Sequence, residues 1–240
     1  MNSFFSFHSK QESFRLFSGE HLLTMGIILT LCILFVFFRK TFQEESKNRL
    51  IRFSLAFLLV LSESVYHVWL LSGNEWSVKT ALPLHLSDLA VFLAIIMLLR
   101  NNCKLLTFMY FAGLGSSIQA ILTPNLGHFS FPHFRYVEFF VSHGTVVLAI
   151  LFMVVSCKFR PTIRSIWTTV LIVDFYAACI FLLNKWLRAN YLYIMHKPGN
   201  TSLLNYLGPW PWYLFSMELV MIISFYILYS PFWLKRRWSG

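Results

Sequence analysis

The stretch ALPLHLSDLAVFLAIIMLLR, residues 81–100, decides the fold, because it is long and apolar enough to cross a bilayer yet begins with Pro83, His85, Ser87 and Asp88. A hydrocarbon core requires about 20 largely apolar residues per helix. The whole chain has this character, since 57% of its 240 residues are hydrophobic and only 12% are charged. Soluble domains carry about 25% charged residues. The composition therefore predicts an integral membrane protein.

Outward from residues 81–100, the sequence shows seven apolar runs and no stretch that could form a separate soluble domain. We predict an all-α, polytopic membrane protein, in which residues 1–240 form a single membrane domain, a bundle of seven transmembrane helices. The first run is expected to stay as a helix, because no small-residue cleavage site follows it. The predicted helices are His21–Phe38, Ile51–Leu71, Ala81–Leu99, Lys104–Leu122, Arg135–Ser156, Arg164–Leu183 and Pro211–Pro231.

Lysine and arginine are distributed unevenly between the two predicted sides of the membrane. Most of the 20 Lys and Arg residues lie in the first, third and fifth connections and in the C-terminal LKRRWSG. Because cytoplasmic segments are enriched in these residues, we expect the N-terminus outside and the C-terminus in the cytoplasm. The net charge of +10 reflects this bias and attraction to anionic headgroups. We expect a multi-pass protein of a cell membrane, the bacterial cytoplasmic membrane, with membrane lipids and no nucleic acid as partners.

The four cysteines predict no disulfide framework. Cys32 and Cys179 fall within predicted helices, whereas Cys103 and Cys157 fall at ends predicted to be cytoplasmic, where thiols stay reduced. We therefore expect small packed core residues.

Polar side chains gather at one depth of the predicted bundle, in its outer half. An ionisable group in hydrocarbon costs at least about 2.5–3.5 kcal/mol, so such residues normally face the bundle interior or a water-filled cavity. A shared depth in several helices therefore predicts one polar pocket that opens to the outside. The residues at this depth are Glu63, His67, His85, Ser87, Asp88, Gln119, Glu138, Ser142, His143 and Glu218.

Helical spacing indicates which of these side chains act together. Glu63 and His67 are four residues apart and His85 and Asp88 are three apart, so each pair shares a helix face. A carboxylate beside an imidazole fixes its tautomer and stabilises its protonated form. We therefore predict that His85 is a general base or acid, that Asp88 orients it, and that His143 faces it. The alternative is that such pairs only hold helices together.

Two long segments, residues 123–134 and 184–210, flank the predicted pocket on the outer side and are expected to rim it. The second ends in a Pro-Trp-Pro-Trp run that cannot form a regular helix. We predict no metal ligand and no cofactor. The predicted substrate-binding residues are Glu63, His67, Ser87, Arg135, Glu138, Asn190, Tyr193, Lys197, Trp210, Trp212 and Glu218.

Four motifs, LPLHLSDLA, HFRYVEFFVSHGT, NYLYIMHKP and LGPWPWY, resemble in this order the YwaF-type family of bacterial integral membrane proteins. The resemblance covers the second predicted helix to the C-terminus. That family is distantly similar to a mammalian multi-span phospholipid acyltransferase family and, in general shape, to bacterial membrane transacylases. The residues that it marks are Pro83, His85, Ser87, Asp88, Glu138, His143, Asn190, Tyr193, Lys197, Pro198, Gly208, Pro209, Trp210 and Trp212.

The resemblance implies a lipid-modifying enzyme, an acyltransferase or transacylase at the extracytoplasmic leaflet that acts on a phospholipid or a lipidated protein. The mammalian family is thought to use a cysteine nucleophile, whereas residues 81–100 contain no cysteine. Direct transfer with His85 as the base is therefore expected.

Two alternatives remain open at the level of sequence. One is a non-enzymatic transporter or receptor for a small solute, in which intramembrane carboxylates would couple to protons. The other is a zinc-dependent lipid amide hydrolase with His67, His85 and His143 as ligands. The nearly apolar inner half of the bundle weighs against a path through the membrane, and the predicted helix Pro211–Pro231 contains no histidine.

Overall fold

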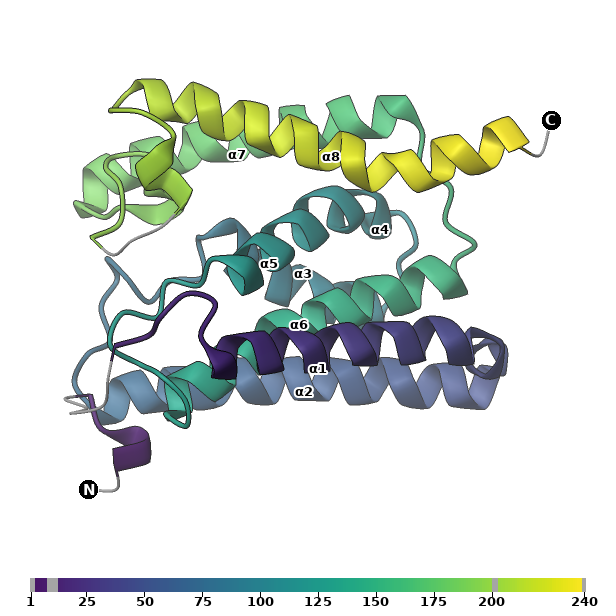
Figure 1. Cartoon of the computed structure of the whole chain (residues 1–240), viewed down its shortest axis with the longest axis horizontal. Helices are drawn as coiled ribbons and strands as arrows, with labels where there is room; N and C mark the ends of the chain where they lie inside the picture. Colours follow the sequence, from purple (N-terminus) through teal and green to yellow (C-terminus); the bar gives the residue numbers. More distant parts are fainter. Residues whose placement is uncertain (1–2, 8–12, 200–202, 239–240) are drawn as a thin grey trace.

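The computed structural model describes residues 3–7, 13–199 and 203–238, in which helices are joined by loops and no strand is found (Figure 1). The α-helices are α1 (Gly19–Phe37), α2 (Glu45–Ser72), α3 (Leu86–Leu99), α4 (Leu105–Phe108), α5 (Leu114–Leu122), α6 (Phe134–Ser156), α7 (Ile163–Leu187) and α8 (Trp212–Trp238). Short turns of other helix types are η1 (Ser3–Phe5), η2 (Phe38–Gln43), η3 (Met109–Gly113), η4 (Tyr191–Tyr193) and η5 (Leu203–Tyr206).

Among the residues that the structure describes, six helices are long and apolar enough to cross a membrane, which confirms a helical, multi-span protein. They are Gly19–Gln43, Glu45–Ser72, Leu105–Leu122, Phe134–Ser156, Ile163–Leu187 and Trp212–Lys235. The span Leu105–Leu122 contains a π turn, η3, between α4 and α5. The remaining predicted span corresponds to α3, which has only 14 residues.

The predicted helix and the observed helix α3 differ in where they begin. The predicted helix began at Ala81 with Pro83 in its first turn, and this is wrong, because α3 begins at Leu86. Residues 81–85 are irregular, and His85 has the extended φ of −70° and ψ of 148° of an N-cap residue. Proline disfavours a helical conformation of the residue before it, which keeps Leu82 out of the helix, and the helix begins only after the N-cap His85.

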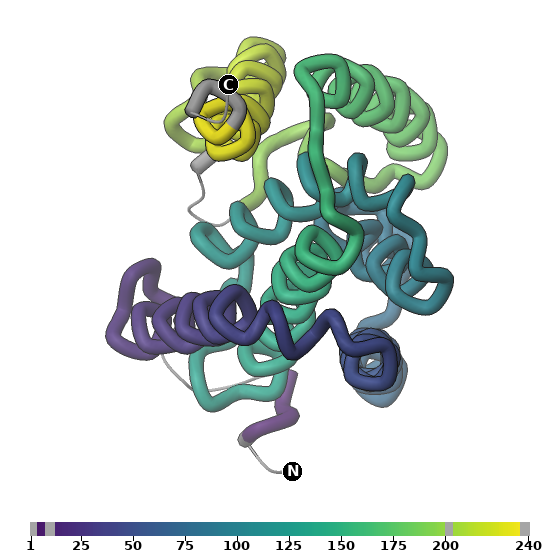
Figure 2. The backbone as a smooth tube through the Cα atoms, turned by 90° about the vertical axis from the view of Figure 1, so that its right-hand side faces the viewer, coloured from purple at the N-terminus to yellow at the C-terminus, as the bar shows by residue number. Residues whose placement is uncertain are grey.

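The central helix is α6, most of whose side chains are buried. It packs against α1, α2, α3 and α5, whereas α7 and α8 pack on each other and against the α4–α5 span (Figure 2). Along the bundle, η1 and the C-terminal end of α8 lie at opposite ends (Figure 1). This packing encloses the side chains of α2, α3 and α6 that face one another.

Cys103 and Cys157 form a disulfide, with their Cα atoms 5.8 Å apart. The prediction that the cysteines form no disulfide is therefore wrong for this pair. The α3–α4 connection meets the last turn of α6, a contact over a sequence separation of 54 residues that no local pattern reveals. Cys32 is half-buried and Cys179 is exposed, so Cys179 is not the packed core residue that we expected.

The segment that contains η1 packs against the end of α2 and the start of α6. The Trp69 indole N–H donates to the Phe5 carbonyl at 2.9 Å, and the ring of Phe7 stacks on Trp69 with 4.0 Å between ring centroids. His133 is the N-cap of α6, and its Nδ1 accepts from the Arg135 N–H at 3.1 Å. Its Nε2 donates to the Ser6 carbonyl at 3.0 Å. These two bonds require the neutral tautomer with the proton on Nε2.

Acidification is expected to destabilise the protein through His133. Burial lowers the pKa of His133, with a smaller opposing effect of its bond to Ser6. Because the pKa of His133 is lower in the folded state than in the unfolded state, its neutral imidazole contributes fully to the free energy of unfolding above the unfolded pKa of about 6.5. This contribution is lost as the pH falls through the folded-state pKa. The unfolding temperature of the wild type should therefore fall below about pH 6.5.

The control for this prediction is His133→Asn, because asparagine caps a helix without titrating. The difference in unfolding temperature between wild type and this variant should shrink as pH falls from 7.5 to 5. A constant difference over that range contradicts a role of His133 in the pH dependence.

Candidate functional site

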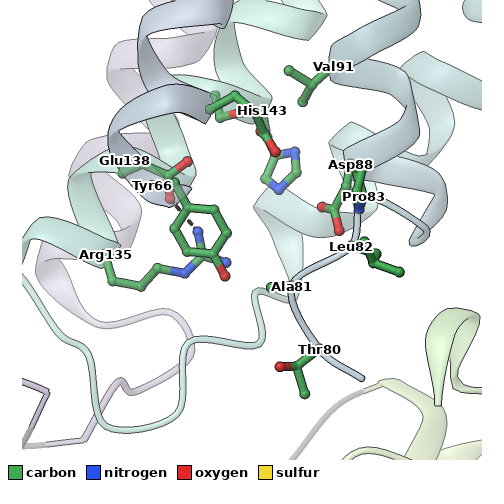
Figure 3. A pocket seen from close by; sticks show the side chains of 12 residues that line it. Tyr66, Thr80, Ala81, Leu82, Pro83, Asp88, Val91, Arg135, Glu138 and His143 are labelled. Carbon is green, nitrogen blue, oxygen red and sulfur yellow. Dashed lines mark hydrogen bonds and ion pairs between the residues drawn. The ribbon is translucent and has the colours of Figure 1, made fainter. Parts of the chain in front are cut away.

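A cavity of about 40 Å³ lies between α2, α3 and α6 and is bordered on one side by residues 80–83. Figure 3 shows Arg135, Tyr66 and Glu138 on one side of it, Asp88 on the other, and the His143 ring pointing into it. Its lining is mostly polar. The lining residues are Glu63, Tyr66, Thr80, Ala81, Leu82, Pro83, Asp88, Val91, Arg135, Glu138, Ser142 and His143.

Arg135 and Glu138 form an ion pair within the first turn of α6. The Glu138 carboxylate also accepts from the Ser62 hydroxyl at 3.3 Å, and its side chain is only 5% exposed. The Arg135 guanidinium lies over the ring of Tyr66, 4.3 Å from its centroid, and 5.3 Å from the centroid of Phe139. The pair and the two rings together hold the guanidinium in a fixed place in the cavity wall.

Glu63 is oriented by a chain of hydrogen bonds from α2 and the loop after it. The Trp76 indole N–H donates to Nδ1 of His67 at 3.1 Å. Because an indole only donates, His67 must carry its proton on Nε2 when neutral. It donates from this atom to the Glu63 carboxylate at 3.2 Å. The predicted pair is thus a contact, in which Glu63 lines the cavity and His67 lies behind it.

His143 is the most unusual side chain of the site. It is 4% exposed, its ring centroid is 4.3 Å from that of Phe139, and its Nδ1 has no hydrogen-bond partner among the described residues. A buried polar atom without a partner costs about 1–3 kcal/mol. A catalytic role is one of the explanations for a buried polar atom without a partner.

Asp88 lies on the opposite wall, in the first turn of α3, where its carboxylate accepts from the Ser87 hydroxyl at 3.4 Å. A carboxylate in the first turn also stabilises a helix through the helix dipole. Chemically, the cavity combines an imidazole, three carboxylates from Glu63, Asp88 and Glu138, and a single guanidinium. Such a set can accept a proton, stabilise a protonated imidazole and neutralise an oxyanion.

His85 does not line this cavity. Its Nδ1 accepts from the Leu192 N–H at 3.2 Å, and its ring centroid lies 4.8 Å from that of Tyr193 and 5.4 Å from that of Tyr191. Leu192 has a φ of 59°, a left-handed conformation that is uncommon outside glycine. The hydrogen bond to the His85 imidazole therefore holds the loop after α7 against the start of α3.

Most other loop residues of the prediction make hydrogen bonds within the segment between α7 and α8, and Tyr193 joins this segment to Asn125. Asn190 accepts from the Met195 N–H at 3.1 Å and donates to the His196 carbonyl at 2.8 Å. Tyr193 accepts from the Asn125 amide at 2.7 Å, Lys197 donates to the Asn205 carbonyl at 3.5 Å, and Trp210 donates to the Ile194 carbonyl at 3.3 Å. Trp212 is 65% exposed. None of these predicted residues lines the cavity.

Glu218 lies elsewhere, because it is hydrogen-bonded to Asp174 between α7 and α8. Among the residues that the structure describes, no group of three or more His, Cys, Asp or Glu side chains could hold a metal ion. His67, His85 and His143, the ligands of the zinc alternative, therefore form no such group.

Tyr66 is one of the cavity residues that sequence reasoning missed. It is three residues after Glu63, so helical spacing places both on one face. A signal was therefore present, but an aromatic residue in a membrane helix is ordinarily a packing residue. Its part in the site depends on Arg135, which comes from another helix.

Comparison with known proteins identifies one family. The model of the TMEM164 family matches residues 16–229. No curated protein and no solved structure matches the chain. The match confirms a multi-span membrane family, while the kinship with YwaF-type proteins and acyltransferases stays a prediction.

Proposed function

Because the chain belongs to the TMEM164 family of multi-span membrane proteins, we propose that it is a lipid-modifying membrane enzyme, an acyltransferase or transacylase. The observation that carries this proposal is the buried imidazole of His143, which lines a cavity together with Asp88 and Arg135 and has an Nδ1 without a partner among the described residues. A base, a carboxylate and a fixed cation are the groups that ester chemistry needs.

In this proposal His143 takes the proton of an acceptor hydroxyl, whose oxygen attacks the carbonyl carbon of a lipid ester. The charge that develops on the carbonyl oxygen is stabilised by the Arg135 guanidinium. The bond to the donor oxygen then breaks, and the leaving oxygen receives the proton from His143.

We assign the base to His143 rather than to His85, the residue that helical spacing favoured. His85 Nδ1 is engaged by the Leu192 N–H, and its side chain is absent from the cavity lining. His85 becomes a positioning residue for the loop after α7. The Lys and Arg distribution favours the extracytoplasmic leaflet for the cavity, whereas the disulfide at the other end of α6 favours the cytoplasmic leaflet. At either leaflet the proposed substrate is a phospholipid or a lipidated protein.

The size of the cavity disfavours the transporter alternative. A volume of about 40 Å³ accommodates a water molecule but not an organic solute, since ligand pockets are commonly about 300–1,000 Å³. An ester on a lipid needs to present only its carbonyl group to such a site, while its chains remain among the apolar helices.

The proposal is tested with the purified full chain in lipid nanodiscs. The discs contain a phospholipid with an isotopically labelled acyl chain and a lysophospholipid, and mass spectrometry follows the label. We expect time-dependent appearance of labelled diacyl product, absent from discs without protein. The proposal is wrong if no label reaches lysophospholipids of several headgroups or an unacylated lipoprotein.

A further inference from the structure

The dimensions of the cavity bear on what can react in it. A site needs about 10–15 Å³ to hold a water molecule, provided that two to four polar partners surround it. The volume of about 40 Å³ meets the first condition, and the side chains of Glu63, Asp88, Glu138 and His143 meet the second. The ring of His143 points into this space (Figure 3).

We propose that this cavity holds a water molecule that His143 activates, so that the protein also hydrolyses acyl esters of membrane lipids to free fatty acids. The inference rests on the proposed acyl transfer, because it uses the same base and the same ester. It adds a second acceptor, water, for the same acyl group.

The hydrolytic step balances without any other reactant. The water oxygen attacks the ester carbonyl carbon while its proton passes to His143, and the carbonyl oxygen becomes an oxyanion. The intermediate collapses, the bond between the acyl carbon and the glycerol oxygen breaks, and His143 returns the proton to that oxygen. The products are a fatty acid and a lysolipid.

The walls of the cavity are arranged to hold a water in place. The Glu63 carboxylate is oriented by His67, which Trp76 holds in one tautomer. The guanidinium of Arg135 is fixed by Glu138 and by the ring of Tyr66. Oriented groups of this kind lose little freedom when a water binds or when charge develops on the ester.

Two lining residues offer a way to change the water site without touching the base. Val91 of α3 is 1% exposed and lines the cavity with an apolar side chain. Val91→Leu adds a methylene group and reduces the space for water. Ser117 of α5 is the matched control, because its hydroxyl is also buried without a partner among the described residues, yet it does not line the cavity.

The experiment uses the full chain in nanodiscs of labelled phospholipid in H₂¹⁸O, with and without lysophospholipid acceptor. Mass spectrometry measures ¹⁸O in the released fatty acid and the ratio of fatty acid released to acyl chain transferred. We expect ¹⁸O-labelled fatty acid from wild type and from Ser117→Ala, and at least a hundredfold less from His143→Ala. Val91→Leu should lower the ratio at least tenfold, and added acceptor should lower it as well.

The outcomes separate the two proposals. Transfer without ¹⁸O-labelled fatty acid overturns the hydrolysis and leaves the transfer standing. Labelled fatty acid without any transferred chain supports the hydrolysis and overturns the transfer. Neither product overturns both, and an unchanged ratio in Val91→Leu that is still folded overturns the placement of the water in this cavity.

Discussion

Replacing His143 by alanine is expected to lower the rate of acyl transfer by about 10²–10⁴-fold, the range that general acid–base catalysis contributes. In the proposed reaction the His143 imidazole is the group that takes the proton of the acceptor and returns it to the leaving oxygen, and alanine removes it without a replacement. The measurement is the initial rate of labelled product formation in nanodiscs.

Two further variants make this prediction specific. Ser117→Ala removes another buried, unpartnered polar group of the described residues and should leave the rate near the wild-type value. His85→Ala should lower the rate of acyl transfer far less than His143→Ala does. It removes the hydrogen bond that holds the loop after α7 against α3, whereas His143→Ala removes the base. A folded His143→Ala variant at the wild-type rate, together with an inactive His85→Ala variant, would return the base to His85.

Breaking the pair between Arg135 and Glu138 is expected to cost about 3–5 kcal/mol of unfolding free energy, because it leaves one buried charge without its partner. Both Arg135→Gln and Glu138→Gln should show this loss. The double variant should lose less than the sum of the two single variants, since it leaves no unpaired charge. Denaturant titration of the reconstituted protein measures the three values.

The matched control is the pair between Lys47 and Glu44, which lies 2.7 Å apart at the start of α2 with both side chains more than half exposed. Lys47→Gln should change stability little, because water screens an exposed pair. If breaking either pair lowers the free energy of unfolding by the same amount, Arg135 and Glu138 are as well hydrated as a surface pair. That result would contradict a fixed cation in the cavity.

The membrane-spanning helices were predictable because a span is a local property of about 20 consecutive residues. Five of the seven predicted runs correspond to single long α-helices, and the run Lys104–Leu122 corresponds to α4, η3 and α5. The apolar pattern of residues 81–85 continues into α3 and therefore concealed its start at Leu86. Local patterns therefore fix where helices exist more securely than where they begin.

The site was predictable only in part, because its contacts join distant segments. Polarity at one depth led to Glu63, Asp88, Glu138 and His143, which line the cavity. The role of His85 depends on the Leu192 N–H, 107 residues away, in a loop whose folding back no periodicity indicates. Glu218 matched the depth of the others but faces Asp174 between α7 and α8, because depth says nothing about the direction in which a side chain points.

The disulfide gives one end of the bundle a chemical marker. Cys157 follows the last turn of α6, whereas Arg135 is in its first turn, so the cross-link and the cavity lie at opposite ends of that helix. Disulfides persist in oxidising compartments and are rare in the cytosol. The redox state of Cys103 and Cys157 in intact cells therefore reports the topology: free thiols that a maleimide alkylates place the cavity at the extracytoplasmic leaflet, and a pair that reacts only after reduction places it at the cytoplasmic one.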